Sequence, residues 1–528
     1  MMKMNPRRRT SSLLRIVAFT ALLVAVAAAQ ISTASLTGLV ADPSGAAAGG
    51  STVIARNKST NVEQRVTTNS SGYYTFASLP VGAYEISVEA PGFKRAISDN
   101  VILDVGQKGR VDFTLELGAV AESVVVKAEA PLLSTQEAAP GAVIENRLVG
   151  GLPLSARNWD DLLLLVAGVQ GDRYTEQSGG TATGRTGGVD VHGVRSLQND
   201  FILDGVDNNS ISENVQELTS QVVRPSVDAI QEFKVISDPY SAEYGRSPGA
   251  AINVTTRSGS NAFHGGVYEF GRNRLFDANN FFANRTHQPK PQEIQNQFGG
   301  QIGGPILKNK LFFFANYEGT RIREGVTRLT NVPLANERIG DFSAAAAAAA
   351  HTTYAPVIDP LTGQPFANNR IPSQRIDPIA GEIMGLVPGP NTTPGSGPLN
   401  ANNFVRTPNI QDSTDSVTGR VDYQADANDR LFVRYSYSNR FRFVPGFFGG
   451  VVDGTSTSAW GRLSMGAQGV SIGWNRVLSP RFVNDLRIGW GRNASLGRQD
   501  PFGQNTLASL GIKGIPDNSV ISGGLPGI

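Results

Sequence analysis

The chain has 528 residues, of which 17% are charged and 59 are glycine, and none is cysteine. Low charge with abundant glycine is typical of β-structure with many turns, and the lack of cysteine excludes disulfides, thiolate metal sites and a lipidated cysteine in this chain. The near balance of 47 basic and 45 acidic residues gives no indication of nucleic-acid binding.

Residues 1–29 have the pattern of a secretory signal peptide. Lys3 and Arg7–Arg9 precede an apolar stretch from Leu13 to Ala28, and small residues predict cleavage after Ala29. The remaining chain would carry 42 basic against 45 acidic residues. A membrane-spanning helix is the alternative, but the uninterrupted apolar run of about 13 residues is short of the roughly 20 required. No later apolar run reaches 18 residues, so a membrane protein with this sequence is expected to be a barrel.

Between Ala34 and Leu117, short apolar strands alternate with turn residues. This spacing predicts a β-sandwich, which we place at residues 30–118. Its centre reads GYYTF at 72–76, LPVGAYEISV at 79–88 and APGF at 90–93. The pattern resembles the carboxypeptidase-regulatory-like domain, a transthyretin-like β-sandwich also grouped with carbohydrate-binding-like folds. That domain is a non-catalytic companion, and none of the four histidines has zinc-ligand spacing.

A linker follows at residues 119–142. It contains an acidic residue, a hydroxyl residue and three valines in succession, namely Glu122, Ser123, Val124, Val125 and Val126. This segment is similar to the TonB box, which can add as an edge strand to a sheet of its partner. The alternative is that these residues form the last strand of the sandwich. The residues alone do not separate the two interpretations, and the position between two domains favours the TonB box.

Residues 143–258 contain three ordered sequence blocks. They read LPLSARNW at 152–159, then VDVHGVRS at 189–196 with FILDGVD at 201–207, and finally AIQEFKVI at 229–236 with SAEYG at 241–245 and GAAINVTTR at 249–257. Together they resemble the α+β plug domain of TonB-dependent receptors. His192 departs from the pattern, because many plugs have arginine there.

The plug region contains residues that invite an active-site interpretation, which the sequence does not support. Asp204 and Asp207 lack the residue ladder of a calcium loop, and no G-x-S-x-G elbow accompanies them. Asp204-Gly205 instead predicts a tight turn after a strand. We therefore expect no catalytic residue, metal or cofactor.

Residues 259–528 are predicted to form the first part of an antiparallel transmembrane β-barrel. The segments FHGGVYEF at 263–270, QFGGQIGGP at 297–305 and LFFFANYEG at 311–319 resemble the Oar-like branch of TonB-dependent receptors. Later strands alternate, with Leu431 and Val433 apolar and Arg434 between Val433 and Tyr435. A soluble sandwich would alternate in the same way, so the preceding plug decides in favour of the barrel.

A long extracellular loop is expected at about 331–406, with the alanine run 344–350 as low-complexity loop. About seven barrel strands precede the chain end, whereas large plugged transporters need about 22. An open sheet edge is not stable in hydrocarbon. The sequence is therefore expected to be a fragment of a longer protein or a truncated product.

The resemblance implies a mainly β, non-enzymatic receptor in the outer membrane of a Gram-negative-type bacterium, with its N-terminal domain in the periplasm. Such a receptor contacts outer-membrane lipid, binds an extracellular substrate (a siderophore, cobalamin, glycan or peptide) and imports it with energy from TonB, ExbB and ExbD. The alternative is an outer-membrane adhesin or carbohydrate-binding surface protein without energised transport. The fold alone does not choose the substrate.

Overall fold

The structure is a computed structural model that describes residues 33–118, 123–125, 141–152, 154, 157–171, 189–194, 198–210, 221–237, 247–279, 281–285, 290–393, 398–453, 461–479, 482–498, 500–515 and 523–525. The signal peptide at 1–29, Glu122, Val126 and the SAEYG segment at 241–245 lie outside these residues. In the described part of the chain, no helix is long and apolar enough to cross a membrane.

The first domain, here called the sandwich, consists of two packed sheets. One contains β4 (Tyr73–Leu79), β1 (Ala34–Ala41), β7 (Lys108–Arg110) and β8 (Phe113–Thr114); the other contains β3 (Glu63–Thr67), β2 (Thr52–Asn57), β5 (Gly82–Glu89), β6 (Arg95–Leu103) and β9 (Ser123–Val125). Alternate residues of β1 are buried, as expected for a strand with one face on the core.

The sandwich core contains two of the tyrosines in its central sequence pattern. Tyr74 is buried edge-to-face against Phe76 at 5.9 Å, and its hydroxyl donates to the Val111 carbonyl. Tyr84 is also buried, and burial raises its pKa to about 12. Tyr73 points to solvent. Tyr74 and Tyr84 are therefore packing residues of the sandwich core.

The second domain, here called the plug, has a sheet in the order β10 (Gly141–Glu145), β15 (Ile230–Ile236), β16 (Ala251–Thr256), β13 (Asp200–Leu203) and β14 (Val206–Asp207). Its other elements are α2 (Asn146–Gly151), η2 (Trp159–Leu165), η6 (Val227–Ala229) and the β11 (Val169–Gly171) and β12 (Val189–Val191) pair. Trp159 is the centre of the core and packs against Phe201 and Phe233.

The third domain, here called the barrel sheet, has seven antiparallel strands, and each pairs with the next of the seven along the chain. They are β17 (His264–Asn273), β18 (Glu293–Leu307), β19 (Leu311–Gly325), β22 (Asn409–Gln424), β23 (Asp429–Val444), β24 (Gly461–Ser479) and β25 (Phe482–Arg498). The sheet does not close, and β17 and β25 are its edges. The predicted number of strands and their alternation are confirmed: Val433 is 41% exposed, whereas Arg434 is 3% exposed.

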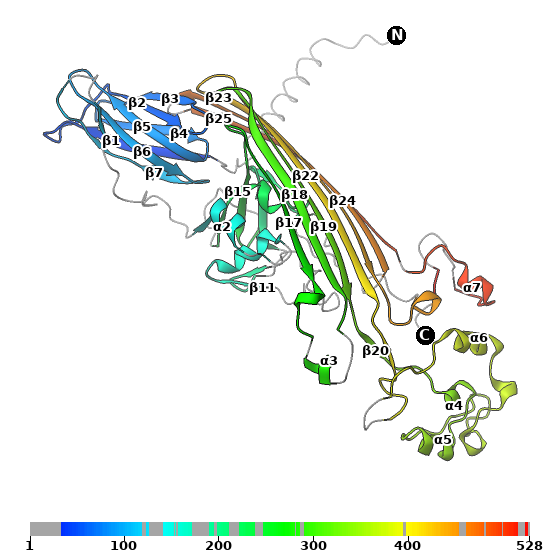
Figure 1. The fold of residues 1–528 in the computed structure, drawn as a ribbon. Coiled ribbons are helices and arrows are strands. Elements are labelled where there is room, and N and C mark those ends of the chain that lie inside the picture. The colour runs from blue at the N-terminus through cyan, green and yellow to red at the C-terminus, as the bar shows by residue number, and fades with distance from the viewer. Residues whose placement is uncertain are drawn as a thin grey trace, which may run out of the picture.

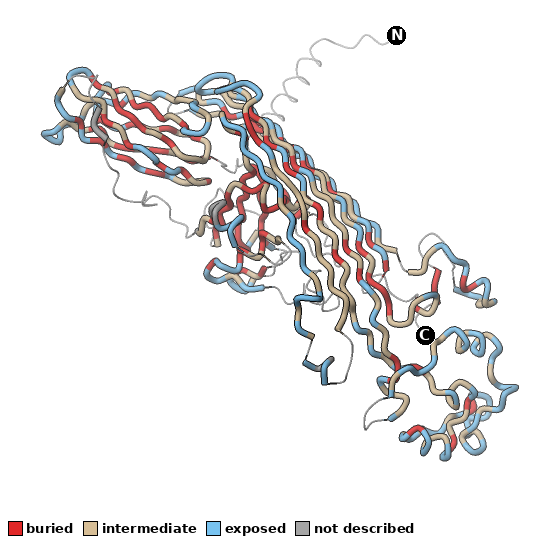
Figure 2. Tube along the Cα trace, viewed as in Figure 1, coloured by how far each residue is buried: buried red, intermediate tan, exposed pale blue. Residues whose placement is uncertain are grey.

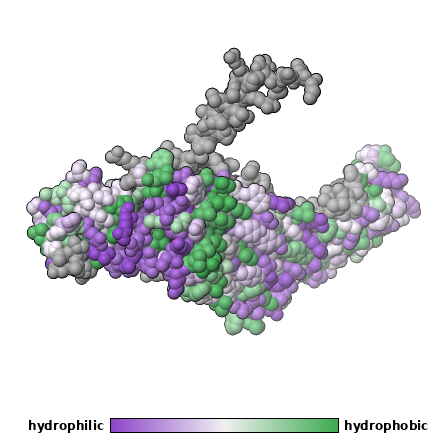
Figure 3. All heavy atoms as spheres, turned by 90° about the horizontal axis from the view of Figure 1, so that it is seen from above, coloured by the Kyte–Doolittle hydropathy of each residue, from purple (hydrophilic) through white to green (hydrophobic). Residues whose placement is uncertain are grey.

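The two faces of the barrel sheet differ in chemistry. On the outer face, Tyr435 pairs with Val470, which pairs with Trp490. Such a row of apolar and aromatic side chains suits contact with lipid. Figure 3 shows hydrophobic residues gathered in a band beside hydrophilic surface. The opposite face, which turns toward the plug, carries most of the buried polar residues of the strands.

The barrel strands have short turns at one end and long loops at the other. The sandwich lies at the end with short turns, and the plug lies along the inner face of the curved sheet (Figure 1). The sandwich contacts its neighbours through loops: the amide of Asn261 donates to the Ser59 carbonyl at 3.0 Å, and the amide of Val105 donates to the Glu232 carboxylate at 2.5 Å.

The loop between β19 and β22 is folded and lies at the far end of the sheet, where much of it is exposed (Figure 2). Its elements are β20 (Arg328–Thr330), α4 (Ala335–Arg338), α5 (Ala344–Ala349), η8 (Ala367–Asn369), η9 (Ser373–Arg375), α6 (Pro378–Leu386) and β21 (Phe404–Arg406). The alanine run, which was expected to be low-complexity loop, instead forms helix α5. Alanine has the highest helix propensity, and the Ser343 hydroxyl caps α5 by accepting from the Ala346 amide.

Four short elements complete the described chain. They are η7 (Arg274–Phe276), α3 (Phe281–Arg285), η10 (Gly450–Asp453) and α7 (Thr506–Ser509).

Candidate functional site

The contact between the plug and the inner face of the barrel sheet is the candidate functional site. Its centre is Asp204, in the hairpin turn between β13 and β14. Asp204 and Gly205 both have positive φ, 53° and 78°, and Leu203 pairs with Val206 across the turn. The predicted Asp-Gly turn is therefore confirmed.

The carboxylate of Asp204 is buried, since the residue is only 1% exposed. It accepts hydrogen bonds from the amide of Thr256 at 2.9 Å and from the Thr256 hydroxyl. These bonds fix the carboxylate on the side of the plug sheet that faces the barrel. A buried carboxylate needs a positive partner as well.

Two arginines of the barrel sheet supply that positive charge. Nη1 of Arg420 on β22 lies 3.0 Å from Oδ1 of Asp204, and Nε of Arg434 on β23 lies 2.8 Å from Oδ2. The two arginines are directly opposite each other in the strand register. Asp204 therefore compensates two neighbouring positive charges, and Asp422 compensates Arg420 further through bonds of 2.9 Å.

A second polar contact joins the plug to β17 and β19. Arg157 lies 2.5 Å from Asp228 within the plug and 3.2 Å from Glu318 of the barrel sheet. Its guanidinium also stacks over the ring of Tyr268, whose hydroxyl donates to Glu318 at 2.7 Å. Cation–π stacking and ion pairing thus hold the same arginine.

The apolar part of the contact lies where plug valines meet glycines of the barrel sheet. A Cβ added at Gly489 would lie 2.0 Å from Cγ1 of Val206, and one added at Gly491 would lie 3.0 Å from Cγ1 of Val222. Any larger residue at Gly489 would require either the plug or the wall to shift. The glycines therefore allow the plug backbone to approach the wall closely.

The candidate TonB-box residues lie away from this contact. Ser123–Val125 form β9, which pairs in parallel with β6 at the edge of the sandwich, with Val124 opposite Ala96. This is the position expected for a last strand of the sandwich. Glu122 and Val126 lie outside the described residues, so the assignment of the five residues as a TonB box stays a prediction.

The other residues singled out in the plug sequence do not come together as a catalytic site. His192 is exposed with a φ of 50°, and Asp207 accepts hydrogen bonds from Asn209. Among the described residues, no group of three or more histidine, aspartate or glutamate side chains has the arrangement of a metal site.

Arg420 was not predicted to be a partner of Asp204, and Arg434 was predicted only as a polar residue between apolar strand positions. A usable signal was present, because arginines on the inner face of a barrel strand need a compensating charge from the plug or the lumen.

The long loop has its own ion pair between Asp359 and Arg375, with Nη2–Oδ1 and Nη1–Oδ2 distances of 2.6 and 3.0 Å. Hydrogen bonding to Arg375, and then to the Leu361 amide, lowers the pKa of Asp359 below 3.8. The pair therefore stabilises the loop fully above pH 3.8, and this stabilisation is lost as pH falls through the lower, folded-state pKa.

Arg375→Gln is expected to raise the pKa of Asp359 toward its ordinary value, as measured by a carboxyl-carbon NMR titration. Arg370→Gln is the matched control, because Arg370 pairs with Asp341 instead. An unchanged pKa in Arg375→Gln would contradict the assigned cause.

Comparison with known proteins agrees with this architecture. Residues 255–528, just over half of the chain, match the outer membrane beta barrel domain family. Residues 143–252 match the TonB-dependent receptor plug domain, and residues 35–116 match the carboxypeptidase regulatory-like domain. The chain belongs to the TonB-dependent receptor family. This membership indicates an outer-membrane location in a Gram-negative bacterium.

Individual relatives of this receptor are distant. The TonB-dependent transporter Oar of Myxococcus xanthus is 29% identical over 287 residues, which are 51% of this chain and 25% of that protein. The receptor chain thus spans about a quarter of the length of the curated relative it matches.

Two solved structures align with this receptor at low identity. The outer membrane transporter YddB from Escherichia coli aligns at 13% identity with a TM-score of 0.43, over 68% of this chain and 40% of that one. A mutant of the ferric enterobactin receptor PfeA from Pseudomonas aeruginosa aligns at 12% identity with a TM-score of 0.40, over 73% and 44%.

Proposed function

We propose that this chain belongs to a receptor that binds an extracellular substrate and imports it across the outer membrane, with energy supplied by TonB, ExbB and ExbD. In this proposal residues 1–29 are the signal peptide, 30–118 the periplasmic sandwich, 119–142 the linker with the TonB box, 143–258 the plug and 259–528 the first part of the barrel. No residue is assigned a catalytic role.

The observation that supports energised transport is the way in which the plug is seated. It contacts the barrel sheet through ion pairs at Asp204 and Arg157 and through valines against glycines. Polar contacts of this kind can be replaced by water when the plug moves, whereas an interlocked apolar core would expose its surface at high cost. The contact therefore suits a plug of which one part can separate from the wall and return.

The order of the plug sheet suggests where a pull from TonB would act. The linker leads into β10, one edge of the sheet, whereas the hairpin of β13 and β14 that carries Asp204 is at the opposite edge. Force on the linker would act first on the hydrogen bonds between β10 and β15. The Asp204 contact would hold the rest of the plug on the wall, so the expected change is a local rearrangement.

One observation favours the second candidate function, an adhesin or carbohydrate-binding surface protein. In the sandwich, β9 adds a strand to the sheet by pairing with β6. A surface protein that only binds its ligand, without energised transport, would need residues 123–125 only to form this strand. The two functions differ in whether Glu122–Val126 engage TonB.

Deletion of Glu122–Val126 tests the proposal. The purified receptor is expected to bind the C-terminal domain of TonB in a pull-down, and the deletion is expected to abolish this binding because the pairing strand is gone. Deletion of Leu133–Glu137 shortens the same linker equally and serves as the control, which should retain TonB. If the two deletions behave alike, the TonB-box assignment is wrong and the surface protein without energised transport becomes the better account.

A further inference from the structure

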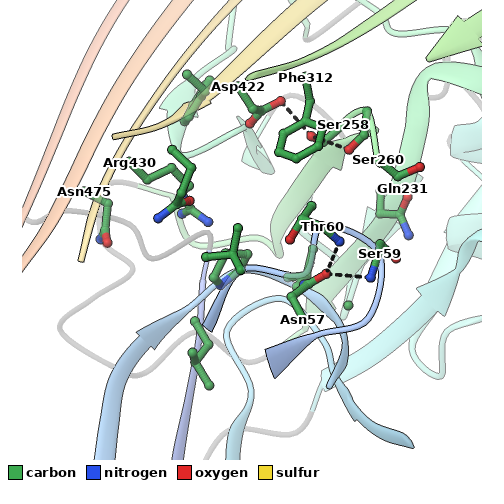
Figure 4. A pocket seen from close by; sticks show the side chains of 18 of the residues that line it. Asn57, Ser59, Thr60, Gln231, Ser258, Ser260, Phe312, Asp422, Arg430 and Asn475 are labelled. Atoms are coloured by element: carbon green, nitrogen blue, oxygen red, sulfur yellow. Dashed lines mark hydrogen bonds between the residues drawn. The ribbon is translucent and has the colours of Figure 1, made fainter. Parts of the chain in front are cut away.

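A cavity of about 220 Å³ lies where the sandwich, the plug and the barrel sheet meet (Figure 4). The sandwich contributes Asn57 and Tyr84, the plug contributes Gln231, and the barrel sheet contributes Arg430 and Asn475. This space is large enough for several water molecules. It is smaller than the sites that hold drug-sized ligands, so its occupant has to be small.

Arg430 is the distinctive side chain of this cavity. It lies near the start of β23, opposite Asn475 of β24 in the strand register, and it is partly buried at the cavity wall. Within the described ranges of the chain, the Arg430 guanidinium makes no hydrogen bond or ion pair with protein. An arginine withdrawn from bulk water without an anionic partner is unfavourable.

The carboxylates near Arg430 are already engaged with other groups. Asp204 binds Arg420 and Arg434. Asp422 accepts from Arg420 through both oxygens and from the Ser258 hydroxyl at 2.8 Å. Asp204 and Asp422 therefore compensate Arg420 and Arg434, and neither aspartate compensates the positive charge of Arg430.

The rest of the lining combines apolar side chains, such as Phe312 and Phe432, with several amides and hydroxyls. The amides and hydroxyls include Asn57, Thr60, Gln231 and Asn475. Such groups can donate hydrogen bonds to oxygen atoms of a ligand or accept them from its hydroxyls. The planar guanidinium of arginine matches the geometry of carboxylate and phosphate.

We propose that this cavity binds a small oxyanion, a carboxylate or phosphate of at most monosaccharide size, with Arg430 as its counter-charge. The ligand would contact all three domains at once. Its binding would therefore also hold the sandwich against the plug and the barrel sheet, because the sandwich loops form one wall of the cavity.

Titration calorimetry on the purified protein in detergent tests the proposal with three probes: inorganic phosphate, galacturonate and galactose. Saturable binding of phosphate or galacturonate is expected, and the one that binds identifies the anion class. Galactose has similar hydroxyls but no charge, so it should bind at least tenfold more weakly than the anion that binds. The bound anion should also raise the melting temperature.

Variants assign the binding to Arg430. Arg430→Gln is expected to weaken anion binding at least tenfold, and Arg430→Lys should retain part of it because the charge remains. Arg476→Gln is the control, since Arg476 lies near the same end of the barrel sheet but is exposed and pairs with Asp429. Gln231→Glu leaves Arg430 in place and adds a negative charge to the lining of the same cavity, which repels an anion, so it should abolish binding even if Arg430→Gln does not fold.

Several results would overturn the proposal. They are the absence of saturable binding of both anions, equal binding of galactose and galacturonate, or unchanged anion binding in Gln231→Glu or in a folded Arg430→Gln protein.

Discussion

Asp204→Ala is expected to destabilise the seating of the plug by about 3–5 kcal/mol, because it leaves Arg420 and Arg434 buried without their shared anion. Both arginines lie within 3.0 Å of the Asp204 carboxylate, and their side chains are only 11% and 4% exposed. The measurement is urea unfolding in detergent, followed by hydrogen exchange of the amides of β13 and β16, which flank Asp204 in the plug sheet.

Asp415→Ala provides the matched control for Asp204→Ala. Asp415 also pairs with an arginine, Arg321, at 2.8 Å, but its side chain is 39% exposed. Loss of an exposed pair is expected to cost about 1 kcal/mol or less. Adding Arg434→Met to Asp204→Ala should recover part of the loss, since one uncompensated charge is removed. Equal effects of Asp204→Ala and Asp415→Ala would show that the Asp204 network does not hold the plug.

Gly489→Ala is expected to loosen the plug by about 1–3 kcal/mol through overpacking. The new Cβ would lie 2.0 Å from Cγ1 of Val206, a distance that requires the plug or the wall to move. Val206→Ala removes the colliding methyl groups, so the double variant should regain most of the stability. The same hydrogen-exchange measurement reports both effects.

The control for Gly489→Ala is Gly466→Ala on β24, where an added Cβ meets no atom within 4 Å. It should leave plug exchange unchanged. A Gly489→Ala loss that Val206→Ala does not rescue would mean that the added methyl acts through the strand itself and not through the plug.

Local patterns in the sequence predicted much of the fold. The alternation around Val433 and Arg434 predicted a barrel strand with one apolar face, and Asp204-Gly205 predicted the hairpin turn; the structure confirms both. These features depend on neighbours a few residues away. The helix at Ala344–Ala349 was missed, although alanine propensity and the Ser343 cap are also local signals.

The candidate site was harder to predict from the sequence. Arg420 is 216 residues from Asp204, so no spacing rule connects them, and their pairing depends on where the plug sits in the barrel. The pairing of Ser123–Val125 with β6 was also difficult to predict. A strand of three residues forms only when a sheet edge is available beside it, and the local sequence does not show where that edge lies. The TonB-box assignment and the domain boundaries accordingly stay predictions.

Asp204 has to meet two unrelated requirements, one from its backbone conformation and one from the charges of Arg420 and Arg434. The backbone conformation at φ 53° is tolerated by glycine, asparagine and aspartate, whereas the two arginines require a negative charge. Glutamate supplies the charge without the local turn chemistry, and asparagine supplies the turn without the charge. Aspartate alone satisfies both, so this position has almost no mutational freedom, and any drift there requires simultaneous change in the barrel wall.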